Sequence, residues 1–308
     1  MHLRALRTVV MAVLIATIAS NTAAQSRVDR NIVYGMYSGA AMLLDVHYPA
    51  KPNGLGIVFI AGSGWTAALG YSATPLKESP QVEMYVPSLL QAGYTVFALT
   101  HRATPPFRYP AQLEDVQRAV RFIRYNAAKY AIAPARIGGM GGSSGAHLIT
   151  LLATLDGTGE ASDPDPVNRE SGKLQCVVAR AAPVDLTQMS GNIGTPLVAL
   201  FLNARVDQAT PKNSVEYKTA WAASPINYVS ADDPPTLLIH GDADRTVPFQ
   251  QSEMMEAALK KVNVPVKLLR IEGADHGPDF PGAKNPPDYK AEMVKWFDTY
   301  LRKPVGSR

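Results

Sequence analysis

The sequence has very little cysteine and only a small excess of one charge. Cys176 is the single cysteine among 308 residues, so no disulfide can form within the chain. A small fold held together by disulfides is therefore excluded. The 30 Lys and Arg residues are nearly balanced by 26 Asp and Glu, which leaves a formal net charge of +4. This excess is too small to indicate a nucleic-acid-binding protein.

The apolar run near the N-terminus is too short to form a membrane span. It covers residues 9–19, well below the roughly 20 residues that a bilayer-crossing helix needs. Arg4 and Arg7 precede it, and small residues follow up to Ala24, as in an export signal. We therefore predict a signal peptide over residues 1–24, a secreted or periplasmic protein, and no stable membrane anchor after cleavage. A retained N-terminal anchor is the alternative.

Common cofactor and metal motifs are also missing. The sequence contains no G-x-x-x-x-G-K-[ST], and the glycine pattern at 139–144 has Ser144 where a dinucleotide fingerprint needs its last glycine. It has neither an H-E-x-x-H pair nor paired cysteines that would suggest a metal site. We therefore expect no cofactor, no metal and no nucleic-acid partner.

Apolar runs that alternate with helical patterns make up most of the chain after the signal. With 46% hydrophobic and 18% charged residues, the chain can bury a sizeable core. The alternation predicts an α/β fold with a mostly parallel central sheet flanked by helices. The expected strands are 42–48, 56–60, 94–99, 136–140, 174–179, 235–240 and 265–271, and the expected helices start at 110 and 145, span 250–261 and follow 288.

The domain organisation is simple. No Pro- or Ser-rich linker divides the chain, so we predict one catalytic domain over residues 31–303. Residues 156–172 are rich in Asp, Gly, Ser and Pro and are expected to be mostly loop. Residues 185–224 have weak periodicity, and we predict that they form a small cap or lid insertion. The oligomeric state is left open.

The motif Gly141-Gly142-Ser143-Ser144-Gly145 has the pattern G-x-S-x-G between a strand-like segment and a helical one. A serine at such a sharp turn is held with its hydroxyl projecting outward, and the crowded positions two before and two after require glycine. Ser143 is therefore the candidate nucleophile. Ser144 is a rival, but Ala146 stands where its second glycine would be needed.

A serine nucleophile needs a base, and the base needs an orienting acid. In this motif the chain order is Ser, acid, His, and only His240 and His276 follow Ser143. His240 ends an apolar strand, which suits a hydrogen-bonded turn residue. His276 lies in a loop of small residues after the last strand, and we predict that it is the base.

Several carboxylates compete for the role of the acid. Asp242 and Asp244 share one loop, and spacing alone does not separate them. Asp275 adjoins His276 and would need an awkward reach back to the same ring, and Asp185 is a candidate helix or turn cap.

The negative charge that develops on an attacked carbonyl oxygen needs N–H donors. We predict the main-chain amide of Ser144 together with those of Ser63 and Gly64, in a loop of small residues after an early strand. The aromatic residues Trp65, Tyr71 and Trp221 are candidates to line a substrate pocket.

These motifs together resemble the α/β-hydrolase superfamily, and more narrowly bacterial feruloyl-esterase-like carboxylesterases, kin to hormone-sensitive lipase and prolyl oligopeptidase. The resemblance runs from about residue 33 to 301. It rests on the sequences LDVHYP (44–49), FIAGSGW (59–65), YPAQLEDV (109–116), GGSSGAHL (141–148), ASP (223–225), LIHGDADRTVP (238–248) and GADHG (273–277).

The resemblance implies the roles of three residues. The family carries its acid at the D of H-G-x-x-D-x-x-V-P, which is Asp244 here, and its serine and histidine fall on Ser143 and His276. One departure concerns the oxyanion loop. The family's usual H-G-G-G-W is A-G-S-G-W in this chain, with Ala61 and Ser63 at the changed positions.

The predicted function is a serine hydrolase that cleaves carboxylic esters through an acyl-enzyme. The expected partner is a small-molecule or polysaccharide-linked ester, and kinship suggests feruloyl or acetyl esters of plant polysaccharides. The alternatives are a prolyl-oligopeptidase-like peptidase or amidase, an aryl formamidase, and a ligand-binding protein on an inactive hydrolase scaffold.

Overall fold

The computed structural model describes residues 27–189, 191, 192 and 194–302. The predicted signal peptide, residues 1–24, lies outside the described residues. In the part of the chain that is described, no helix combines the length and apolar character that crossing a membrane would require.

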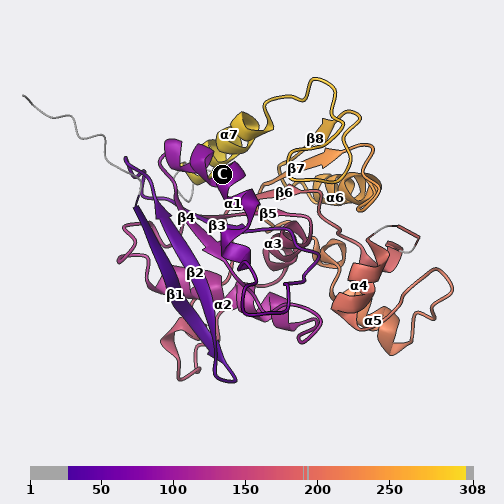
Figure 1. The fold of residues 1–308 in the computed structure, drawn as a ribbon, viewed down its shortest axis with the longest axis horizontal. Helices are drawn as coiled ribbons and strands as arrows, with labels where there is room; N and C mark the ends of the chain where they lie inside the picture. Colours follow the sequence, from indigo (N-terminus) through magenta and orange to yellow (C-terminus); the bar gives the residue numbers. More distant parts are fainter. Residues whose placement is uncertain (1–26, 190, 193, 303–308) are drawn as a thin grey trace, which may run out of the picture.

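An eight-stranded sheet forms the centre of the fold, in the order β1-β2-β4-β3-β5-β6-β7-β8 (Figure 1). β2 pairs antiparallel with β1 and with β4, whereas the other neighbouring strands are parallel. The predicted fold class, a mostly parallel sheet flanked by helices, is confirmed. The strands are β1 (Arg27–Tyr37), β2 (Ala40–Tyr48), β3 (Gly56–Ile60), β4 (Thr95–Leu99), β5 (Ile137–Gly142), β6 (Val177–Arg180), β7 (Thr236–Gly241) and β8 (Val266–Ile271).

Helices cover both faces of the sheet. The buried side chains of α1 and α7 pack on one face, and those of α2, α3 and α6 pack on the other. The helices are α1 (Pro80–Gln91), α2 (Ala111–Tyr125), α3 (Ser144–Thr154), α4 (Thr195–Leu202), α5 (Val215–Ala222), α6 (Gln250–Lys261) and α7 (Tyr289–Leu301), with short 3₁₀ turns η1 (Leu76–Glu78), η2 (Pro166–Arg169), η3 (Leu186–Gln188) and η4 (Pro225–Tyr228).

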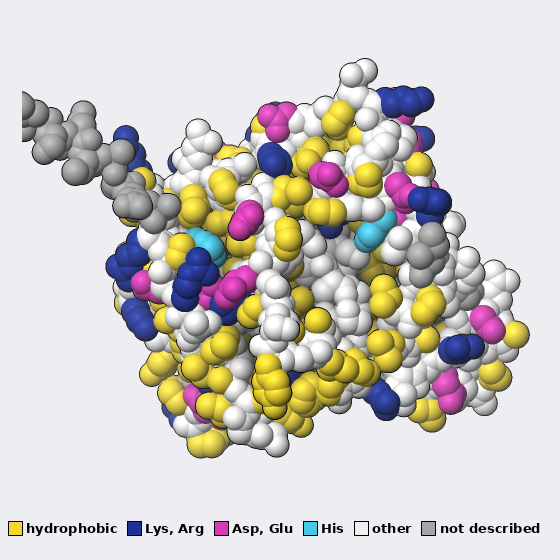
Figure 2. Space-filling view, in the orientation of Figure 1, with side chains coloured by type: hydrophobic (Ala, Val, Ile, Leu, Met, Phe, Trp, Pro, Cys, Tyr) yellow, Lys and Arg dark blue, Asp and Glu magenta, His cyan; other side chains and the backbone are white. Residues whose placement is uncertain are grey.

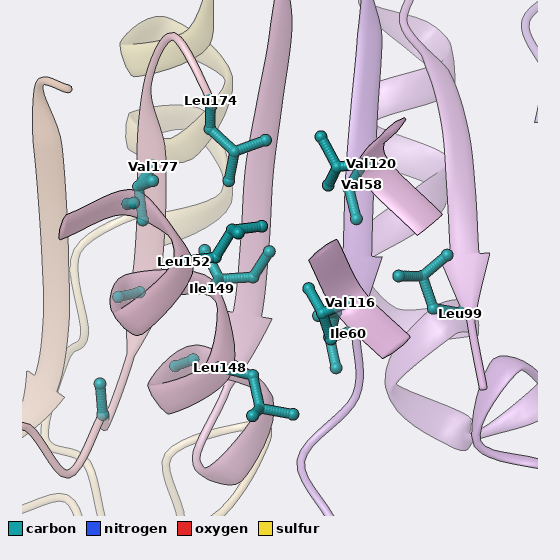
Figure 3. Close-up of a cluster of buried hydrophobic side chains, with 14 of the residues drawn as sticks. Val58, Ile60, Leu99, Val116, Val120, Leu148, Ile149, Leu152, Leu174 and Val177 are labelled. Carbon is teal, nitrogen blue, oxygen red and sulfur yellow. The ribbon is translucent and has the colours of Figure 1, made fainter. Parts of the chain in front are cut away.

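Strand β3 contributes side chains to two hydrophobic cores, one on each face of the sheet. Its side chains alternate between the two faces because successive residues of a strand point in opposite directions. Ile57 and Phe59 join the core under α1 and α7, whereas Val58 and Ile60 join the other one. Figure 3 shows the second core, where these two side chains lie near those of α2 and α3, among them Val116, Val120, Leu148, Ile149 and Leu152.

Two elements were not predicted from the sequence. β1 is an edge strand whose residues are mostly exposed or half-buried, so it lacks a strong apolar alternation. α1 carries Pro80 in its first turn and Pro87 inside the helix, which obscures its helical pattern. The segment 185–224, predicted to be a cap, contains α4 and α5. In Figure 1 these two helices lie on the opposite side of the molecule from β1 and β2.

Candidate active site

The three predicted triad residues follow three parallel strands. Ser143 comes directly after β5, Asp244 follows β7, and His276 follows β8. Because the carboxyl ends of parallel strands meet at one edge of a sheet, ligand sites of α/β proteins form there. The topology therefore brings together residues that are far apart in the sequence.

Ser143 occupies a strained turn between β5 and α3. Its φ of 51° and ψ of −121° lie in a region that residues other than glycine seldom adopt. A Cβ at Gly141 would lie 2.4 Å from the backbone of Gly145, and a Cβ at Gly145 would lie 2.2 Å from the Ile60 carbonyl oxygen. The crowding that the motif implied is present, and it explains both glycines.

The side chains of the three residues form one hydrogen-bonded line. The Ser143 hydroxyl is 3.0 Å from His276 Nε2, and His276 Nδ1 is 2.7 Å from Asp244 Oδ2. Since an ionised carboxylate only accepts hydrogen bonds, Nδ1 carries the proton and Nε2 is free to accept the serine proton. His276 has a side chain that is 19% exposed, so a substrate can approach the ring.

Asp244 is held as a buried carboxylate. Its Oδ1 accepts the main-chain amides of Thr246 and Val247, both at 2.8 Å. Burial alone would raise the pKa of Asp244, but hydrogen bonds from His240, His276 and the Val247 amide, with the electrostatic attraction of the His276 ring, lower the pKa well below its usual range. The carboxylate is therefore ionised at neutral pH, as the orienting acid requires.

The competing carboxylates have other partners. Asp242 binds Arg270 at 2.7 Å and the Gly273 amide at 2.7 Å. Asp275 accepts the Arg245 guanidinium at 2.7 Å. Asp185 caps η3, as expected for a turn residue.

His240 has the structural role predicted for it. The residue is fully buried in β7, where its ring bonds the Ser252 hydroxyl at 2.7 Å and the Val247 carbonyl at 3.0 Å. Its Nε2 also lies 3.3 Å from Asp244 Oδ2, the same carboxylate oxygen that His276 Nδ1 contacts.

The predicted oxyanion donors need one correction. The Ser63 amide donates to the Ser144 hydroxyl at 2.9 Å, so it is already occupied. The Gly64 amide has no acceptor in the described part of the chain, and the Ser144 amide lies in the first turn of α3, where helix N–H groups lack partners within the helix. Gly64 and Ser144 are therefore the available pair, and Ser63 is a donor only if its bond to Ser144 is given up.

Trp65 was predicted to line a pocket, and this is wrong. The residue is only 2% exposed. Its indole stacks on Phe201 of α4 with ring centroids 4.4 Å apart, and its Nε1 donates to His147 Nδ1 at 3.1 Å. His147 donates in turn from Nε2 to the Ala223 carbonyl at 2.7 Å, and burial lowers its pKa to about 4. Trp65 thus packs its loop against α3 and α4 in one core.

The other two pocket candidates have exposed side chains. Tyr71 is fully exposed in the loop after Trp65. Trp221 is on α5, partly exposed, and packs against Tyr228 of η4 with ring centroids 5.6 Å apart. Neither has a described contact with Ser143 or His276.

Three residues near the site were missed by sequence reasoning. Gln81 of α1 holds the oxyanion loop by a reciprocal pair of bonds to Gly62, at 3.0 and 2.9 Å. Leu197 of α4 packs against Gly64, where a Cβ would lie 2.7 Å from Leu197 Cδ1. Arg180 at the end of β6 bonds the Gly277 carbonyl at 2.6 Å. These partners are far apart in sequence, and no motif marks them.

Charged side chains lie close to His276, where Arg245 and Asp275 form an ion pair. Figure 2 shows a shallow hollow near the middle of the face, between the positions of α1 and α4 in Figure 1, and most atoms around it are hydrophobic or uncharged. No group of three or more His, Cys, Asp or Glu among the described residues could hold a metal ion. The chemistry available from these residues is that of a serine, an imidazole and main-chain amides.

Several known proteins are similar to this chain in sequence. "Probable carboxylic ester hydrolase LipM" of Mycobacterium tuberculosis is 27% identical over 289 residues, which cover 91% of this chain and 63% of that protein. "Esterase LipQ" of the same organism is 27% identical over 224 residues, covering 72% of this chain and 50% of the relative. The chain therefore spans between half and two thirds of the length of these curated relatives.

Solved structures agree with the fold. A truncated form of a carbohydrate esterase from gut microbiota has a TM-score of 0.74 at 28% identity, over 92% of this chain and 99% of that one. An acetyl ester-xyloside bifunctional hydrolase from Caldicellulosiruptor lactoaceticus has a TM-score of 0.72 at 26% identity, over 87% and 95% of the two chains. The BD-FAE family profile matches residues 44–259. With this match over most of the sheet and the serine turn, the chain belongs to the BD-FAE family of feruloyl-esterase-like α/β-hydrolases.

Proposed function

We propose that this protein is a serine hydrolase of carboxylic esters, in which Ser143 is the nucleophile, His276 the general base and Asp244 the orienting acid. The observation that carries the proposal is the continuous hydrogen-bonded line between them, with distances of 3.0 and 2.7 Å. A strained serine turn next to free main-chain amides supports the same reading.

The reaction follows from this geometry. Ser143 Oγ attacks the ester carbonyl while His276 Nε2 takes its proton, and Asp244 stabilises the imidazolium that forms. The amides of Gly64 and Ser144 bind the oxyanion. The intermediate collapses as His276 returns the proton to the leaving alcohol, which leaves an acyl group on Ser143. Water then enters, loses a proton to His276 and releases the acid and the free serine.

The proposed substrates are acetyl or feruloyl esters of plant polysaccharides. Two structural neighbours support this proposal, because one is a carbohydrate esterase and the other an acetyl ester-xyloside bifunctional hydrolase.

The proposal includes export. Residues 1–24 have the charged start, apolar run and small residues of a signal peptide. The enzyme is proposed to act outside the cytoplasm, as one catalytic domain over residues 31–303 with a cap at 185–224.

Ester turnover tests the proposal directly. Hydrolysis of p-nitrophenyl acetate is measured for the wild type, Ser143→Ala and Ser144→Ala. Ser143→Ala is expected to lose at least about 10³-fold in kcat because the nucleophile is gone. Ser144→Ala is expected to keep at least about a tenth of wild-type kcat because its contribution is a main-chain amide. No turnover by the wild type on any aryl or sugar ester, or full turnover by Ser143→Ala, would contradict the proposal.

A further inference from the structure

Arg180 is a buried cation beside the proposed triad. It ends β6 and is only 2% exposed, yet no Asp or Glu of the described chain comes within ion-pair distance of its guanidinium. Burying a charge without a direct partner is costly. Burial lowers the pKa of Arg180 somewhat, while Tyr85 and Asp244 act in the opposite direction, and an arginine keeps its charge in proteins. Such a residue calls for a functional reason.

Arg180 contacts the backbone next to His276 and the backbone of Ser143. Its Nη1 donates to the carbonyl of Gly277, the residue after His276, at 2.6 Å. Its own main-chain carbonyl accepts the Ser143 amide at 2.7 Å. The guanidinium also lies 5.7 Å from the ring centroid of Phe280, in the same loop as His276. One residue thus contacts both the nucleophile turn and the base loop.

The end of β5 leaves room for this side chain. A Cβ at Gly142 would lie 2.5 Å from Arg180 Nη2, so the strand carries no side chain there. The Nε of Arg180 is buried without a hydrogen-bond partner in the described residues, so the guanidinium does not use its full bonding capacity. Among the described residues, the Gly277 carbonyl is the one acceptor that the Arg180 side chain bonds, so we take this contact as the role of the side chain.

The base loop needs such an anchor. His276 lies in the segment 272–288, between β8 and α7, which forms neither strand nor helix. The Arg245–Asp275 ion pair also ties this loop to the Asp244 loop, but Arg245 is largely exposed, and exposed pairs contribute little. A buried, charge-assisted hydrogen bond is stronger.

We propose that Arg180 is a positioning residue for His276: it fixes the Gly277 carbonyl relative to the Ser143 turn and so keeps His276 Nε2 within reach of the serine hydroxyl. The inference rests on the proposed function, since it concerns the geometry of the same proton transfer. It predicts a loss in the chemical step, not in substrate binding.

Arg124 of α2 offers a matched control. It is 8% exposed, has no carboxylate partner among the described ion pairs, and bonds the carbonyls of Pro134 and Lys173 at 2.9 and 2.5 Å. Those carbonyls precede β5 and β6, at the edge of the sheet opposite the triad. Replacing either arginine removes a buried guanidinium and its carbonyl bonds, but only Arg180 contacts the base loop.

The experiment compares Arg180→Met with Arg124→Met in the exported chain. Steady-state turnover of p-nitrophenyl acetate and the melting temperature are measured for both. Arg180→Met is expected to lose about tenfold to a hundredfold in kcat, as a misplaced base does, with KM within about twofold of the wild type. Arg124→Met is expected to lower the melting temperature to a similar extent and to keep kcat within about twofold.

A spectroscopic measurement distinguishes misplacement of His276 from a general loss of stability of the fold. The proton shared by His276 Nδ1 and Asp244 gives a downfield ¹H NMR signal. This signal is expected in the wild type and in Arg124→Met but broadened or lost in Arg180→Met.

If Arg180→Met does not fold, Arg180→Gln and Arg124→Gln are compared in the same way, because glutamine is too short to reach Gly277. Equal kcat in the two arginine variants, with the signal intact in both, would overturn the inference. An inactive wild type would instead overturn the proposed function.

Discussion

The two ends of the Ser143–His276 hydrogen bond are built in different ways. Ser143 is fixed by its immediate neighbours. β5 enters the turn, α3 leaves it, and the flanking glycines allow the backbone of each element to pass within a few ångströms of the other. His276 lies in the long segment 272–288 and depends on residues far away in the sequence.

The base is held from several directions at once. Asp244 holds its ring, Arg180 holds the following carbonyl, and Tyr85 of α1 donates to the carbonyl of Pro278 in the same loop. The Asp275 carboxylate also accepts a hydrogen bond from the Arg245 amide at 3.0 Å. The nucleophile is thus positioned by covalent geometry and close packing, and the base by a set of side-chain hydrogen bonds.

This difference predicts how substitutions near Ser143 and near His276 will affect the fold and the activity. A change at the serine turn should damage the fold and activity together, because the turn is part of the core. A change at the base loop should reduce the rate while the fold remains, in proportion to the strength of the bond that is removed. The predictions that follow test this contrast.

The largest effect is expected for Gly145→Ala. The added Cβ would lie 2.2 Å from the Ile60 carbonyl oxygen, so β3, β5 or α3 would have to shift. We expect loss of nearly all activity and a melting temperature lower by several degrees, measured by circular dichroism. Gly35→Ala is the control, because a Cβ there meets its nearest atom at an ordinary 3.5 Å. A stable and active Gly145→Ala would mean that the turn is not crowded as described.

Asp244→Asn is expected to have the second-largest effect. The Thr246 and Val247 amides would hold the asparagine oxygen, since both donate to Oδ1 now. The amide nitrogen would then face His276 Nδ1 and force the ring into the wrong tautomer. We expect kcat to fall by about 10³- to 10⁴-fold, as in other serine triads.

Asp242→Asn is the matched control for this prediction. It changes the same loop, but Asp242 pairs with Arg270 and not with the imidazole. Its kcat is expected to stay within about threefold of the wild type, as for an exposed ion pair. If the two substitutions reduced turnover equally, Asp244 would not be the orienting acid.

Asp275→Ala is expected to have the smallest effect. It removes the exposed ion pair with Arg245, which ties the acid loop to the base loop, and the hydrogen bonds that the Arg245 and His276 amides donate to the Asp275 carboxylate. A reduction in kcat of about two- to fivefold follows from the strength of exposed ion pairs. Turnover assays at low and high salt would check it, since screening should shrink the difference. A loss as large as that of Asp244→Asn would show that the exposed pair, and not Asp244, controls the base.

The part of the site that depends on neighbouring residues, the serine turn, was predicted well from the sequence. The strand before Ser143, the helix after it and the flanking glycines all follow from a short motif whose physical requirement is local. The helix 250–261 and the helix after Asp288 were also predicted, because the apolar periodicity of α6 and the capping Asp288 of α7 lie within single segments.

The parts that depend on distant pairs were not predictable. The bond from the Ser63 amide to the Ser144 hydroxyl joins residues 81 positions apart, and it removes a donor that the motif alone makes available. The burial of Trp65 depends on Phe201 of α4, whose packing no periodicity indicates. The contact of Arg180 with Gly277 spans 97 positions and has no sequence signal.

The most direct test of the account is covalent labelling with a fluorophosphonate, followed by mass spectrometry of the digested protein. Wild-type protein is expected to carry one adduct per chain, on the peptide that contains Ser143. The adduct should be absent in Ser143→Ala and should form far more slowly in His276→Ala, because the hydroxyl needs its base. An adduct on Ser144 or elsewhere, or equally fast labelling of His276→Ala, would contradict the central claim that Ser143 is a nucleophile activated by His276.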